Sequence, residues 1–188
     1  MPGDRRVKYT KMVLRDSLIK LLHDKPISRI TVKELCEYAD INRATFYAHY
    51  ADQFDFLKQI ETELITDINS YLDNFNIETG ETDLLPMIFR ILEYIEKNKE
   101  LCRVLLGENG DMDFRTNIFH LLRDRVVFEW QKNRQVDDNT AEYIYTYVVT
   151  GSIGVISKWL LDQNPLPPQS MAEFVTCLVN QGIGFFIA

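Results

Sequence analysis

The side chains best suited to a chemical task lie close together in the segment NRATFYAHY, residues 42–50. In the major groove of DNA an arginine donates two hydrogen bonds to guanine O6 and N7, and threonine or alanine contacts the thymine methyl group. Tyrosine and histidine donate to phosphate oxygens, which fixes the register of a protein on the duplex. The segment therefore predicts base contacts by Arg43, Ala44 and Thr45, and phosphate contacts by Tyr47 and His49.

Two short helices joined by a tight turn are expected to position these side chains. Thr31 and Glu34 form the pattern of a capping box, so a first helix should begin at Val32. Its apolar residues follow the spacing of one helix face, at Val32, Leu35, Cys36 and Ala39. Asp40 and Asn42 then interrupt the pattern, and both tolerate turn conformations.

The second helix is expected from Arg43 to Tyr50, with Asn42 as its N-cap. Phe46 and Tyr50 are four residues apart and share one face, which we expect to be buried, while the polar residues occupy the rest of the surface. This local pattern fits a DNA-binding helix-turn-helix, but it also fits a plain helical hairpin within a bundle.

The segment ITVKELCEYADINRATFYAHYADQFDFL resembles the DNA-binding domain of the tetracycline-repressor (TetR/AcrR) family, over about residues 8 to 60. The resemblance implies that Phe46 and Tyr50 pack inside. It also implies the positions that approach DNA, and with Lys33 and Asn42 added the candidate set is Thr31, Lys33, Asn42, Arg43, Ala44, Thr45, Tyr47 and His49. Two departures stand out. Asp40 replaces a usual turn glycine, and Gln53 replaces a frequent phosphate-binding lysine.

The charge of the chain is unevenly distributed. The net charge is −7, which alone argues against a nucleic-acid partner, but residues 1–60 hold 11 Lys and Arg against 8 Asp and Glu, a net charge of +3. Residues 61–188 hold 10 against 20, a net charge of −10. Arg5, Arg6, Lys8 and Lys11 precede or begin a first helix expected over Val7–Asp24, either as a phosphate-binding arm or as a frayed terminus.

The fold class expected is all-α, because helical spacing recurs along the chain and strand signals are few. We expect a three-helix DNA-binding domain over residues 1–51 and a larger helical effector-binding and dimerisation domain over 52–188, with helix 52–75 bridging them. Further helices are expected at 84–97, 99–106, 113–133, 138–162 and 169–186. The polar segments at 76–83 and 162–168 should be loops.

The last two helices, over about 138–162 and 169–186, are too apolar to stand alone. The family resemblance implies that they form the interface of a homodimer, although ordinary packing within one chain is the alternative. The uncharged run 143–157 is shorter than the roughly 20 apolar residues that span a bilayer, so we expect a buried helix and no membrane partner.

An aromatic-rich set in the middle of the chain is a candidate pocket for a small apolar or aromatic effector. Its members are Met87, Phe89, Tyr94, Phe114, Phe119, Trp130, Tyr143 and Tyr147. Aromatic residues at helical spacing are more often plain core, so that alternative stays open.

Nothing in the sequence predicts an enzyme, a cofactor or a metal site. His23, His49 and His120 are scattered, and Cys36, Cys102 and Cys177 lie far apart as expected free thiols. The N-terminus lacks an apolar signal core, which favours a cytoplasmic protein. The leading hypothesis is a ligand-responsive repressor that binds a palindromic double-stranded operator as a homodimer. The alternative is an adaptor or coactivator of the same fold that binds a protein partner.

Overall fold

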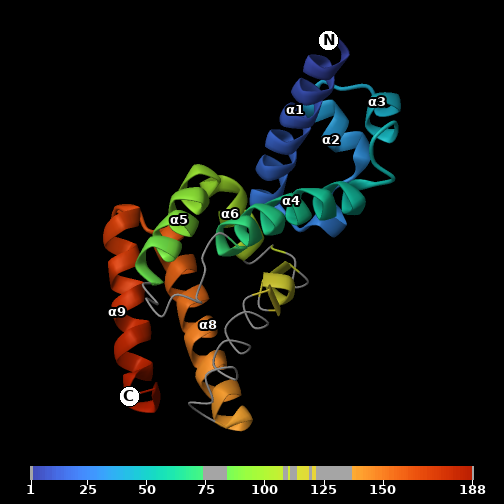
Figure 1. The fold of residues 1–188 in the computed structure, drawn as a ribbon. Coiled ribbons are helices and arrows are strands. Elements are labelled where there is room, and N and C mark those ends of the chain that lie inside the picture. The colour runs from blue at the N-terminus through green and yellow to red at the C-terminus, as the bar shows by residue number, and fades with distance from the viewer. Residues whose placement is uncertain are drawn as a thin grey trace.

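A computed structural model describes residues 2–73, 84–107, 110, 114–118, 120–121 and 137–187. Every regular element in those ranges is a helix, which confirms the all-α prediction. The helices form a small N-terminal group and a larger C-terminal group, and the two chain ends lie far apart (Figure 1).

The N-terminal group contains α1 (Pro2–Asp24), the short 3-10 helix η1 (Ile27–Arg29), α2 (Val32–Ala39) and α3 (Arg43–Tyr47). Their core is built on apolar side chains with at most 1% exposure, namely Leu14, Leu18, Ile30, Leu35 and Phe46. The first helix begins at Pro2, five residues before the predicted start. A proline fits there because the first helical residue needs no amide partner. Lys8 and Lys11 therefore lie exposed on a helix.

The C-terminal group contains α5 (Leu84–Lys97), α6 (Lys99–Leu106), α8 (Asp138–Leu161) and α9 (Pro168–Ile187). α5 packs along α9, α6 packs on both α1 and α8, and α8 contacts α9. The predicted bounds are confirmed for α5 and α6 and are within one residue for α8 and α9. Of the helix predicted at 113–133, residues 114–118 and 120–121 are helical, and the rest lies outside the described residues, as does the loop at 76–83.

α4 (Gln53–Asp73) lies between the two groups (Figure 1). Two reciprocal hydrogen bonds cap its start. The Asp55 amide donates to Asp52 Oδ1 at 2.8 Å, and the Ala51 amide donates to Asp55 Oδ2 at 2.9 Å. Asp52 is therefore the N-cap of α4. Near its other end, the Tyr94 hydroxyl of α5 donates to Asp67 Oδ2 at 2.6 Å, so α4 contacts both groups.

α8 differs from the buried helix expected over residues 143–157. By length and composition its segment Asn139–Leu161 passes the test for a membrane-spanning helix, with a mean hydropathy of 1.2, but only 28% of its most apolar window is buried. A single helix of this length and composition is weak evidence for a membrane. Tyr143 and Tyr147 of this helix are 71% and 65% exposed.

Replacing Asp52 tests the cap on α4. We expect Asp52→Ala to lower the free energy of unfolding by about 1 kcal/mol, because the Asp55 amide loses its acceptor. Asp52→Asn keeps the side-chain oxygen and should lose much less. Urea denaturation followed by circular dichroism measures both, and equal losses in the two variants would show that the cap does not stabilise α4.

Candidate nucleic-acid interface

The start of α2 is fixed by hydrogen bonds at Thr31 and Glu34. Thr31 Oγ1 accepts from the Glu34 amide at 3.2 Å, which confirms the predicted N-cap. The Glu34 carboxylate accepts from Lys25 Nζ at 2.6 Å. That hydrogen bond is the largest cause of a lowered pKa at Glu34, with a smaller contribution from the Thr31 backbone. Lys25 thus ties the end of α1 to α2, a role that no sequence pattern indicated.

The turn between α2 and α3 depends on Asp40. Its backbone is left-handed, with φ of 52° and ψ of 43°. The Asp40 amide donates to the Glu37 carbonyl at 3.4 Å and the Ile41 amide to the Cys36 carbonyl at 2.9 Å, which is the pattern of a Schellman motif. A positive φ favours glycine, and aspartate is among the few other residues that tolerate it. The predicted turn is confirmed.

α3 is shorter than predicted. Asn42 Oδ1 accepts from the Ala44 amide at 2.8 Å and so caps the helix as expected. Regular α-helix ends at Tyr47, however, and the His49 and Tyr50 amides both donate to the Phe46 carbonyl at 3.0 Å. The end predicted at Tyr50 is wrong because the last turn tightens.

Three rings form an aromatic triad beneath α3: Phe46, Tyr50 and Phe56. Phe46 is fully buried and Tyr50 is 5% exposed, which confirms the predicted inner face. The ring centroid of Tyr50 lies 5.3 Å from that of Phe46 and 4.4 Å from that of Phe56, while Phe46 and Phe56 meet edge to face at 5.9 Å. Burial raises the pKa of Tyr50. The triad joins α3 to the first turn of α4.

The predicted DNA-binding residues all belong to the α2–turn–α3 unit. Seven of them are exposed and Thr45 is half-buried; the seven are Thr31, Lys33, Asn42, Arg43, Ala44, Tyr47 and His49. Tyr47 keeps 57% of its surface exposed although its ring meets Phe46 edge to face. Lys33 Nζ lies 3.9 Å from Glu37 Oε1, so a carboxylate competes with phosphate for this ammonium. This unit therefore presents arginine, threonine, tyrosine and histidine side chains on a surface that the aromatic triad holds from beneath.

The structure describes six of the eight candidate effector-binding residues. Phe114 is buried in the core, and Met87 and Phe89 are partly buried against it. Tyr94 is held by Asp67, and burial, followed by that bond, raises its pKa. Tyr143 and Tyr147 of α8 are exposed. Phe119 and Trp130 lie outside the described residues.

Tyr147 contacts the neighbouring helix α9. A Cβ atom added at Gly182 of α9 would lie 3.2 Å from Tyr147 Cε1, so the ring rests on this glycine.

The described residues contain no group of three or more His, Cys, Asp or Glu side chains placed to hold a metal ion.

The family model TetR_C_8, described as "Transcriptional regulator C-terminal region", matches residues 82–181, more than half of the chain. The chain belongs to the TetR family of transcriptional regulators. This agrees with the helix-turn-helix geometry at its N-terminal end and confirms the family expected from residues 30–57.

Similar proteins carry related descriptions. An uncharacterized HTH-type transcriptional regulator, YxbF from Bacillus subtilis, is 22% identical over 178 residues, which cover 89% of this chain. The matched region spans only 44% of the length of that relative.

Solved structures share the fold. A TetR transcriptional regulator from Streptococcus agalactiae matches with a TM-score of 0.65 at 21% identity, over 95% of this chain and 98% of that chain. The dihydroxyacetone kinase operon activator DhaS matches with a TM-score of 0.62 at 16% identity, over 95% and 98%. The fatty acid degradation regulator FadR from Bacillus halodurans matches with a TM-score of 0.62 at 11% identity, over 93% and 96%.

Replacing Asp40 tests the turn. We expect Asp40→Gly to raise the free energy of unfolding by about 0.5–1 kcal/mol, because glycine adopts the left-handed conformation without a Cβ penalty. Asp40→Ala should lower it by about 1 kcal/mol, since alanine has that penalty and no local hydrogen bond. Urea denaturation measures both changes. If the Asp40→Ala variant were as stable as the Asp40→Gly variant, backbone strain at this position would not explain the change in stability.

Proposed function

We propose that this TetR-family regulator binds an inverted-repeat operator as a homodimer and acts as a ligand-responsive repressor. The observation that carries the proposal is the exposed face of α3 above the aromatic triad. A helix in this setting enters the major groove while its buried side holds it in place. A regulator of transcription acts where the DNA is, so the proposed location is the cytoplasm.

Each candidate side chain has a distinct expected role at the DNA. Arg43 would donate to a guanine edge, and Ala44 and Thr45 would contact thymine methyl groups. Tyr47 and His49, both exposed, would donate to phosphate oxygens. Thr31 and Lys33 at the start of α2 and Asn42 at the turn would add further contacts, and Lys8 and Lys11 on α1 bring positive charge to the same end of the molecule.

The exposed side of α8 and α9 supports a dimer. Large apolar side chains remain exposed there: Tyr143 and Tyr147 on α8, Leu161 at its end, and Phe174 and Leu178 on α9. Nothing lies within 4 Å of a Cβ atom added at Gly151 or Gly154, so a second helix has room to approach α8 closely. A second copy would cover this surface and place two α3 helices about one turn of DNA apart.

A bound effector would act by shifting the population of dimer states. A ligand that prefers a dimer whose α3 helices are wrongly spaced weakens DNA binding by the ratio of its affinities for the two states. α4 is the helix expected to transmit this change to α3, because Phe56 contacts the base of α3 while Asp67 binds Tyr94 of α5. A small apolar or aromatic effector remains the expected class.

The roles of the α3 side chains separate in a binding selection from random DNA. We expect Arg43→Ala to relax base preference at one position of each half-site, because a bidentate contact to guanine contributes about 1–3 kcal/mol of discrimination. Tyr47→Ala and His49→Ala should weaken binding to all sequences alike, because phosphate contacts carry no sequence information. An Arg43→Ala variant with unchanged preference would refute its base contact.

The wild-type protein decides between the regulator and the adaptor in the same experiment. Selective retention of the DNA upstream of its own gene at moderate salt supports the proposal, and no selective binding favours the adaptor. A reporter gene placed downstream of that DNA shows whether the protein represses or activates transcription. Expression of the reporter should rise when the regulator is removed, and a fall would make the protein an activator.

The dimer surface is tested by Leu178→Asp. A carboxylate at the centre of an apolar interface is costly to bury, so we expect the variant to sediment as a monomer where the wild type sediments as a dimer. Phe54→Asp is the matched control, because Phe54 is equally exposed, at 48% against 47%, but lies at the start of α4. If Leu178→Asp stays dimeric, this surface is not the interface.

A further inference from the structure

The positive charge of the N-terminal group is not on the helices that carry the candidate DNA-binding residues. Residues 1–30, which contain α1 and η1, hold 8 Lys and Arg against 3 Asp and Glu, a net charge of +5. Residues 31–55, here called the reading unit, span α2, the turn, α3 and the first residues of α4. They hold 2 Lys and Arg against 5 Asp and Glu, a net charge of −3. The reading unit therefore faces a polyanion with a charge that opposes contact.

The single lysine of the reading unit is paired with a carboxylate. Lys33 Nζ lies 3.9 Å from Glu37 Oε1, one turn further along α2, and the two side chains are 64% and 67% exposed. Such an exposed pair adds little to stability. Its effect on DNA binding is larger, because a phosphate that reaches Lys33 also comes close to Glu37. The pair thus offers a phosphate almost no net charge.

The start of α4 carries two further carboxylates. A helix start attracts anions through its free amides and its dipole. Here the Asp55 amide already donates to Asp52 Oδ1 at 2.8 Å, and the Ala51 amide donates to Asp55 Oδ2 at 2.9 Å. Gln59 Nε2 lies 3.3 Å from both carboxylate oxygens of Asp55 and holds that side chain in place. Because Phe56 of the same turn packs beneath α3, these two negative charges lie next to the proposed DNA surface.

Other exposed cations lie outside the reading unit. Lys8 and Lys11 of α1 and Arg29 of η1 are exposed, and the described residues show no ion pair for them. The N-terminal end of α1 lies, like α3, at the end of the molecule opposite α8 and α9 (Figure 1). Cations on α1 attract a duplex of any sequence, whereas the carboxylates of the reading unit oppose it.

We propose that Glu37, Asp52 and Asp55 lower the sequence-independent affinity of each reading unit, so that DNA is retained only while both α3 helices of a dimer are engaged. This inference rests on the proposed function. Phosphate contacts supply essentially all of non-specific binding, and a carboxylate beside a phosphate opposes them. Two weak units on one dimer still bind an operator, because binding of the first raises the effective concentration of the second. Once an effector moves one α3 helix off its half-site, the other unit is too weak to hold the DNA.

The double variant Glu37→Gln with Asp52→Asn removes two of these charges from each protomer and keeps the side-chain oxygen that caps α4. Fluorescence anisotropy with the full chain measures its Kd for a duplex without an operator and for a duplex with one half-site. We expect both Kd values to fall about five- to tenfold at about 0.1 M salt, because Lys33 becomes free to bind phosphate. The dependence of Kd on salt should become steeper for the same reason.

The matched control is Asp24→Asn with Glu96→Gln. It removes the same number of charges from exposed side chains at the C-terminal end of α1 and on α5. Salt screens exposed charges that lie more than about 10 Å apart, so both Kd values should stay close to those of the wild type. Unchanged Kd values in the Glu37→Gln, Asp52→Asn variant would overturn the proposal. An equal fall in the control would also overturn it, because net charge alone would then explain the gain.

Glu37→Gln alone keeps the test decisive if the double variant fails to fold, because it leaves the cap of α4 untouched. Its Kd values should fall about two- to threefold. The duplex without an operator separates this inference from the proposed function. If the wild type shows no selective operator binding, the proposed function fails, and the gain of the variants on this duplex still decides the role of the carboxylates. If the wild type binds its operator selectively and the variants show no gain, only the present inference fails.

Discussion

The burial of Phe46 and Tyr50 against Phe56 is the constraint on which the candidate DNA-binding surface depends. α3 has five residues, and a helix this short does not persist in water without tertiary support. The aromatic triad holds it from below, and the Asn42 cap and the left-handed turn at Asp40 hold its start. Because the apolar side is fully used in this way, Arg43, Tyr47 and His49 are left facing outward.

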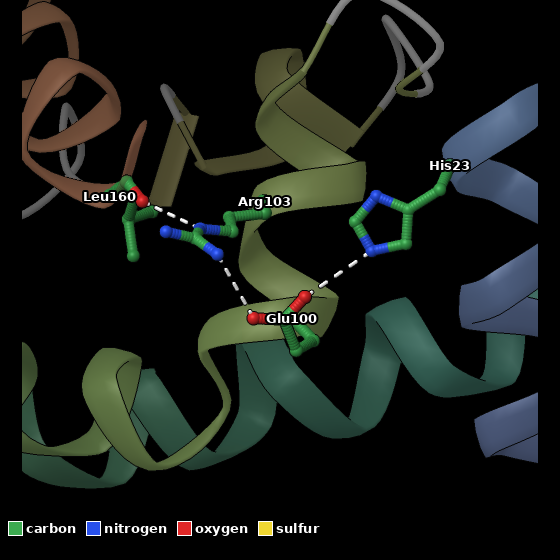
Figure 2. Close-up of polar contacts among 4 residues, drawn as sticks. All are labelled: His23, Glu100, Arg103 and Leu160. Carbon is green, nitrogen blue, oxygen red and sulfur yellow. Dashed lines mark hydrogen bonds and ion pairs between the residues drawn. The ribbon is translucent and has the colours of Figure 1, made fainter. Parts of the chain in front are cut away.

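The same aromatic packing also fixes the start of α4 against α3. Phe56 lies one turn from the Asp52 cap, so the start of α4 and the base of α3 form one packed unit. Further along α4, the ring of Tyr71 lies 5.6 Å from that of Tyr94, and Asp67 accepts the Tyr94 hydroxyl. Burial followed by that bond raises the pKa of Tyr94, which keeps the hydroxyl a donor. α6 makes a second connection, to α1, which includes the Arg15–Asn98 hydrogen bond just before α6 and the His23–Glu100 contact (Figure 2).

The two ends of the molecule differ in the surface that they present. The N-terminal end combines basic side chains with a small, well-packed core, a combination suited to a polyanion. The C-terminal helices α8 and α9 instead leave large apolar side chains exposed although the rest of the chain is acidic. The negative charge of this part of the chain repels DNA, and large exposed apolar side chains are typical of a surface that contacts another protein.

The sequence by itself determined the local features of the fold. Helix caps such as Thr31 and Asn42 and the spacing of apolar residues depend on neighbours in the chain, so the turn, the buried face of α3 and most helix bounds were predictable. The start of α1 and the end of α3 were not. The family followed from the same residues.

Tertiary structure decided which helix covers which face. Apolar spacing shows that a face needs covering but not what covers it, so the sequence could not place Phe114 in the core and Tyr143 on the exterior. Nor could it pair Glu34 with Lys25 or His23 with Glu100, because such contacts depend on the path of the chain between helices and leave no periodic pattern.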